Sequence, residues 1–247
     1  MKKDSLVHRA SGRWGRVAAL IGTALTLTAV VITARGGPPH HCDYGTDRTC
    51  LWQKVVACKS DPSQCAYVNL AQQFVVIADA HHKSHVLTVP TMRVTGIEDP
   101  QVQAPSFNFW DHAWDQAKRY VQRPKEHMGL AINCEPCREQ DQLHIHAACV
   151  KREVRETLEK RAHEIKPSWG GVSLTFGGHS FDTRRLGKNE IYKTSPFQLL
   201  RDKPQAWHHM GQHTLAVIGQ KDESFIALDS FDRAHAEDLL DLDCTNP

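Results

Sequence analysis

Two histidines separated by one residue, His144 and His146, have the residue types and the spacing best suited to chemistry in this sequence. They lie in a segment, 142–150, where apolar residues occupy every second position, as in a half-buried β-strand. Side chains of a strand alternate between its faces, so the two imidazoles should share one face, about 6.5–7 Å apart at the backbone. Neutral imidazole is a nucleophile near pH 7 and forms a labile phosphoramidate, so the pair indicates phosphorus chemistry.

Two nearby cysteines offer an alternative interpretation of the same segment. Cys134 and Cys137 precede the histidines, and two thiolates with two imidazoles would complete a tetrahedral zinc site. In an oxidising compartment these cysteines would instead form disulfides, and a Cys134–Cys137 bridge would stiffen the loop that leads to the histidines. We expect no metal and no other cofactor, and zinc binding is the main alternative.

The elements that must position the histidines predict an α+β fold. Strands joined by short turns, with helices grouped between them, indicate an antiparallel sheet with flanking helices. The predicted strands are 74–79, 85–90, 128–133, 142–150, 213–219 and 224–230, and the predicted helices are 105–121, 151–164 and 232–242.

The N-terminal residues are predicted to target the chain to a membrane. Residues 1–16 are rich in Lys and Arg, and residues 17–34 carry no charge and reach the lower length limit of a spanning helix. Basic residues ahead of the apolar run favour a cytoplasmic N-terminus and an exported remainder. The run is either an uncleaved anchor or a signal cleaved after Ala34, and 35–45 would form a tether to a domain over 46–247.

Cysteine usage and charge agree with an exported domain that does not bind nucleic acid. The net charge is only +2, and no basic stripe is present. An even number of cysteines in an exported chain indicates disulfides. The pairings that we expect are Cys42–Cys50, Cys58–Cys65 and Cys149–Cys244.

The histidine segment resembles the histidine-triad superfamily, whose motif has three histidines alternating with apolar residues after an Asn and a Gln. Asn133 and Gln140 precede the motif here. His144 matches the middle histidine, which is the nucleophile in that superfamily, and His146 matches the third. Gln142 stands where the first histidine would be, so proton movement through that position is open.

Longer segments resemble the bacterial CDP-diacylglycerol pyrophosphatases, from about residue 50 to residue 244. The matching segments are 90–100, 108–110, 140–146, 152–155, 195–197 and 209–211. The resemblance implies a membrane-tethered, histidine-triad-like hydrolase that splits CDP-diacylglycerol into CMP and phosphatidate. His144 would attack the cytidine-side phosphorus, and His146 would assist.

The resemblance also implies substrate contacts, a partner and a location. The candidate substrate-binding residues are Asn133, Gln140, Gln142, Arg93, His179 and Arg184, with Arg185 as a further pyrophosphate contact and His209 without an assigned task. The expected partner is CDP-diacylglycerol in the bacterial inner membrane, crossed once by the chain, with the catalytic domain in the periplasm. Transfer of CMP to another phosphate acceptor and simple nucleotide or lipid binding are alternatives, and the sequence does not indicate an oligomeric state.

Overall fold

The structure is a computed structural model that describes residues 42–204 and 206–245. The predicted segments 1–16 and 17–34, and the tether as far as residue 41, lie outside the described residues. Within the described ranges, no helix is long and apolar enough to cross a membrane.

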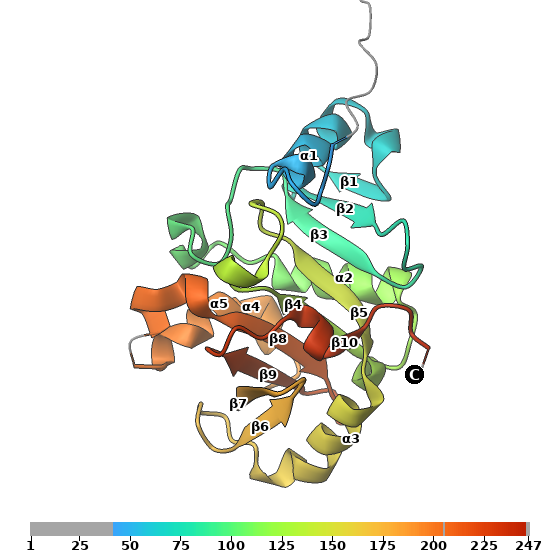
Figure 1. Cartoon of the computed structure of the whole chain (residues 1–247). Helices are drawn as coiled ribbons and strands as arrows, with labels where there is room; N and C mark the ends of the chain where they lie inside the picture. The colour runs from blue at the N-terminus through green and yellow to red at the C-terminus, as the bar shows by residue number, and fades with distance from the viewer. Residues whose placement is uncertain (1–41, 205, 246–247) are drawn as a thin grey trace, which may run out of the picture. The chain divides into compact units, whose positions relative to one another are not determined.

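A large antiparallel sheet forms the centre of the described part and confirms the predicted α+β class (Figure 1). Its strands follow the order β1-β2-β3-β5-β4-β8-β9-β7-β6, and β10 pairs with β5. The strands are β1 (Tyr67–Asn69), β2 (Phe74–Ala78), β3 (Val86–Pro90), β4 (Met128–Ile132), β5 (Ile145–Val150), β6 (Ser173–Phe176), β7 (His179–Leu186), β8 (Thr214–Gly219), β9 (Phe225–Ser230) and β10 (Leu240–Asp241).

Helices flank the sheet, many of them single turns. The α-helices are α1 (Cys50–Ser60), α2 (Trp110–Tyr120), α3 (Arg152–Arg161), α4 (Glu190–Lys193) and α5 (Pro196–Leu199). The 3-10 turns are η1 (Pro62–Gln64), η2 (Pro100–Gln103), η3 (Lys125–His127), η4 (Glu135–Cys137), η5 (Ala162–Glu164), η6 (Leu200–Asp202), η7 (Ala206–Gln212) and η8 (Ala236–Asp238).

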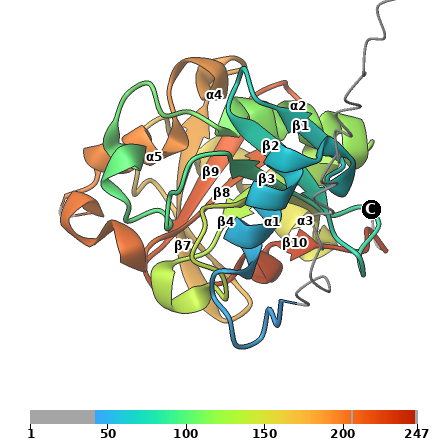
Figure 2. The ribbon, with the colours of Figure 1, turned by 90° about the horizontal axis from the view of Figure 1, so that it is seen from above.

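The two faces of the sheet are covered by different helices. The amphipathic helix α2 buries Trp110 and Trp114 in the main core together with Ile145 of β5. On the other face, α1 packs Val55 against Val89 of β3. Figure 2 shows β2 and β3 between α1 and α2. A second hydrophobic core packs α3 with side chains of β4 to β9.

Both predicted hairpins are confirmed, with β2 paired to β3 and β8 paired to β9. The helix expected from Pro105 begins instead at Trp110, whose N–H donates to the Asn108 side-chain oxygen at 3.2 Å. The prediction of a last helix over 232–242 is wrong, because this segment forms η8 and the short strand β10. On one edge of β5, pairing with β3 ends at Ala147. The backbone groups beyond that residue need other partners, and β10 pairs with them.

All three expected disulfides are confirmed, and a fourth joins Cys134 to Cys137. The Cys149–Cys244 bridge spans 95 residues and ties the end of the described chain to β5. The other three bridges close short local loops.

We expect removal of the long disulfide to destabilise the domain more than removal of a short one. The estimated loop-entropy contribution is about 4.7 kcal/mol for a loop near 100 residues and below about 3 kcal/mol for loops shorter than 15. The double variant Cys149→Ala/Cys244→Ala should therefore lose more free energy of unfolding than Cys42→Ala/Cys50→Ala, whose separation is 8 residues. Urea titration of both variants measures the difference, and equal losses would contradict the prediction.

Candidate active site

Strand β5 and the residues before it present two imidazoles on one face of the sheet, as the alternation predicts. Leu143 and Ile145 point into the core that α2 covers. His144 and His146 therefore point to the opposite face. Their ring centroids lie 4.9 Å apart. His146 is only 7% exposed, and His144 is half-buried.

A backbone hydrogen bond fixes the protonation of His144. Its Nδ1 lies 2.7 Å from the carbonyl oxygen of Gln142, which can only accept, so Nδ1 carries the hydrogen. The Nε2 atom of the neutral ring then keeps its lone pair. Burial lowers the pKa of His144 to about 4, and the positive charge of Arg138 acts in the same direction. The ring is thus a neutral potential nucleophile at pH 7.

The Gln142 side chain is a structural clamp in this structure. It is fully buried, and its Nε2 donates to the carbonyls of Met92 and Pro90 at 2.9 and 3.2 Å. Its Oε1 accepts from the N–H of Val94 at 3.4 Å and lies 3.5 Å from the Arg93 guanidinium. Residues 142–143 are therefore held by hydrogen bonds to the end of β3 and the chain that follows it. The strand predicted over 142–150 begins only at Ile145.

A third histidine, His85, completes the group and was missed by the sequence prediction. It is 4% exposed, and its Nε2 lies 3.1 Å from Nδ1 of His146, with the two rings stacked. Its Nδ1 lies 2.8 Å from a carboxylate oxygen of Asp79. The sequence contained one signal for this contact, the predicted hairpin that carries His85. His85 stands two residues before Leu87, which is the cross-strand neighbour of His146. Only the β3–β5 register reveals that proximity.

Two arginines near the histidines differ in whether a carboxylate neutralises their charge. Arg138 is buried and forms ion pairs with Glu98 and Asp141 at 2.6 and 3.1 Å. Arg93 stacks over the Trp52 ring at 5.6 Å and reaches Gln142. Among the described residues, no carboxylate forms an ion pair with Arg93, so its charge is available to an anionic ligand.

Asn133 and Gln140 occupy different environments. Asn133 is the residue after β4, and His144 is the residue before β5, the strand with which β4 pairs. The Asn133 Oδ1 accepts from the Ala236 N–H at 2.6 Å, which leaves its amide NH2 group for another partner. The Gln140 side chain instead binds backbone groups of Leu51, Tyr44 and Asp47, and so anchors the start of α1.

The remaining candidates do not join the histidine group. Arg184 lies on β7, on the face that α2 covers, and forms ion pairs with Asp202 and Glu190. Arg185 pairs with Asp222 at 3.1 Å. His179 donates to the Asp232 carbonyl at 2.6 Å, and His209 lies against the Phe231 ring.

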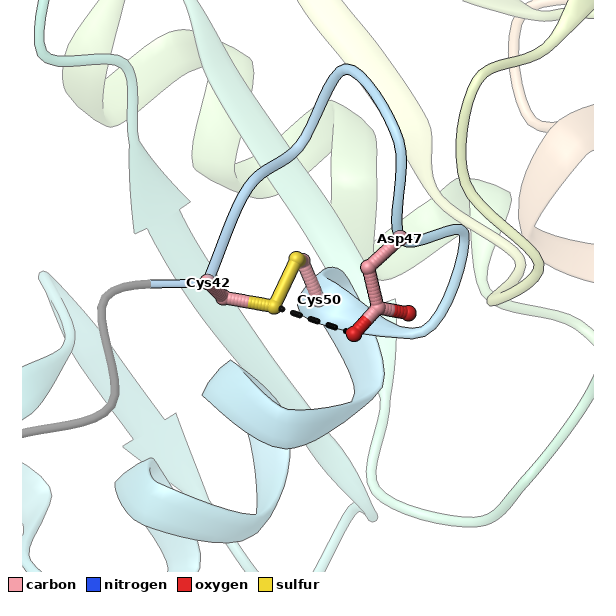
Figure 3. A group of neighbouring side chains, drawn as sticks. All are labelled: Cys42, Asp47 and Cys50. Atoms are coloured by element: carbon pink, nitrogen blue, oxygen red, sulfur yellow. Dashed lines mark hydrogen bonds between the residues drawn. A yellow bond between two sulfur atoms is a disulfide. The ribbon is translucent and has the colours of Figure 1, made fainter.

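The cysteines do not offer thiolates to a metal. The disulfide between Cys134 and Cys137 removes the two sulfur ligands that the zinc alternative requires. Cys42, Asp47 and Cys50 also lie close enough together to suggest a ligand set. Figure 3 shows, however, that the two sulfurs are bonded to each other, with Asp47 3.6 Å from the Cys42 sulfur.

Comparison with known families identifies the family of the chain. The family model described as CDP-diacylglycerol pyrophosphatase matches residues 46–246, most of the chain. All of the histidine group, from Asp79 to His146, lies inside the matched range. The chain belongs to the CDP-diacylglycerol pyrophosphatase family of hydrolases.

Proposed function

We propose that the chain hydrolyses CDP-diacylglycerol through a covalent CMP–histidine intermediate formed on His144. The observation that carries the proposal is the hydrogen bond from His144 Nδ1 to the Gln142 carbonyl, because it leaves the Nε2 lone pair free. Nε2 attacks the cytidine-side phosphorus in line, a P–N bond forms, and the bond to the phosphatidate oxygen breaks. Phosphatidate leaves with that electron pair.

The charge of the pyrophosphate is balanced by groups around the nucleophile. Arg93 supplies a positive charge that no described carboxylate neutralises, and Trp52 limits the directions that its guanidinium can take. The Asn133 amide donates a hydrogen bond to a phosphoryl oxygen beside His144. Donors fixed in a partly buried site need little reorganisation as charge develops, so they stabilise the transition state more than mobile groups do.

Water completes the reaction. It attacks the phosphorus of the CMP adduct, the P–N bond breaks, and His144 recovers its lone pair. His146 Nε2 has no hydrogen-bond partner among the described residues, so its lone pair is free to accept a proton from the attacking water in this proposal. A phosphate acceptor in place of water would give CMP transfer, and the partition between the two acceptors is measurable on the same intermediate.

The substrate places the enzyme at a bilayer surface. Diacylglycerol stays in the membrane, so an anchor through residues 17–34 would raise the effective concentration of substrate at the site. Four disulfides among the described residues favour an oxidising compartment. We therefore propose a periplasmic domain anchored once in the bacterial inner membrane.

Replacement of the nucleophile tests the covalent route. His144→Ala should reduce CMP release by about 10³-fold or more, because the intermediate cannot form. Acid-quench mass spectrometry should detect a CMP adduct on His144 of the wild-type protein and none in the variant. His163→Ala is the matched control, since that side chain is 78% exposed, and it should keep full activity. Comparable turnover by a folded His144→Ala protein would refute the assignment.

The pH dependence follows from the burial of His144. Only its neutral form attacks, and its pKa is lowered to about 4, so lowering the pH protonates the nucleophile only near that value. We expect kcat/KM to be level from about pH 7 to about pH 5 and to fall as the pH drops through about 4. A pH–rate profile with an inflection near 6.5, the ordinary histidine value, would contradict this expectation.

A further inference from the structure

A continuous line of hydrogen bonds leads from His146 to the protein surface. His146 Nδ1 lies 3.1 Å from His85 Nε2, and His85 Nδ1 lies 2.8 Å from Asp79 Oδ2. Both histidines are buried, whereas the Asp79 side chain is 22% exposed. The two rings are nearly parallel, with an interplanar angle of 14°. The line begins at the site and ends at solvent.

The direction of each hydrogen bond is set by its end groups. Burial acts to raise the pKa of Asp79, but hydrogen bonds from the His81 N–H, from His85 and from the His82 N–H outweigh it and lower the pKa. Asp79 is therefore a carboxylate that accepts from His85 Nδ1. His85 Nε2 then accepts from His146 Nδ1, and His146 Nε2 keeps a lone pair. In this orientation Nε2 of His146 is a base, not a donor.

Several charged groups face this line from neighbouring elements. Burial lowers the pKa of both His85 and His146. Asp79 and Glu237 of η8 oppose the shift at His85, and His82 adds to it. The neighbouring His144 also lowers the pKa of His146.

The two site histidines differ in what their Nδ1 atoms contact. His144 Nδ1 donates to a backbone carbonyl, which orients the ring but cannot take up a proton at neutral pH. His146 Nδ1 donates to a second imidazole, which can. A backbone carbonyl is enough to orient a ring, so the imidazole partner of His146 indicates a role beyond orientation.

We infer that His85 and Asp79 form a proton relay that serves hydrolysis of the CMP intermediate. The inference rests on the proposed covalent function. As water attacks the phosphorus, one of its protons moves to His146 Nε2, and the electron pair of the P–N bond returns to His144 Nε2. The His146 Nδ1 proton moves to His85 Nε2, the His85 Nδ1 proton moves to Asp79, and Asp79 releases it to solvent. The second water proton stays on the new phosphoryl hydroxyl of CMP and ionises from there.

The next cycle restores the starting tautomers. The Nε2 proton of His146 passes to the departing phosphatidate oxygen, while solvent refills both Nδ1 positions through Asp79 and His85. A phosphate group leaves readily without a proton, whereas water is a weak nucleophile that needs a base. The relay should therefore matter most in the second half-reaction.

Rapid-quench kinetics on His85→Gln and Asp79→Asn tests the relay with CDP-diacylglycerol in detergent micelles. Both replacements can still form hydrogen bonds, but neither titrates near neutral pH. We expect the rate of CMP-adduct hydrolysis to fall by about 10²-fold, while the rate of adduct formation changes less than about threefold. The adduct on His144 should then accumulate during turnover, which a merely structural defect would not produce.

Lys83→Ala is the matched control, because Lys83 lies in the same loop and is exposed. It should leave both rates unchanged. Circular dichroism identifies any variant that fails to fold, and the other relay variant then decides. Unchanged adduct hydrolysis in a folded relay variant, or equal loss in both half-reactions, would overturn the relay alone. Absence of a CMP adduct in the wild-type protein would overturn the covalent function and the relay with it.

Discussion

The pairing of β5 with neighbours on both sides is the constraint on which the site depends. His146 is the cross-strand neighbour of Leu87 on β3 and of Ala131 on β4. With Ile145 and Ala147 buried against α2, the register cannot slip by one residue without turning the histidines into the core. The fixed register brings His85 to one side of His146.

The local pattern was sufficient to place His144 and His146 on one face of a strand but not to predict their surroundings. Alternation within 142–150 is a property of neighbouring residues, so His144 and His146 could be assigned to one face from the sequence. The contact between His85 and His146 joins residues 61 apart and depends on which strands pair, which no local pattern specifies. For the same reason, charge alone suggested Arg184, although β7 carries it on the opposite face of the sheet.

Burial keeps the imidazoles of His144 and His146 neutral, and it also reduces the free energy of unfolding. Removal from water disfavours the imidazolium form, so His144 and His146 stay neutral where solvated histidines begin to protonate. A buried nitrogen without a partner, such as Nε2 of His146, costs about 1–3 kcal/mol. The large cores on both faces and the Cys149–Cys244 bridge at the end of β5 offset that cost. The strand that carries the reactive groups is thus among the most strongly restrained elements described.

Gln142 explains how the site works without a histidine at the first position of the motif. An amide offers two donors and an acceptor at once, and Gln142 uses them on Pro90, Met92 and Val94. A neutral imidazole has one donor, so it would leave one of those carbonyls unpaired. A protonated imidazole would add a positive charge beside His144 and hold its proton affinity lower still. The amide, which does not titrate, therefore fixes the carbonyl that orients His144 at any pH, and the proposed mechanism assigns proton transfer to His146.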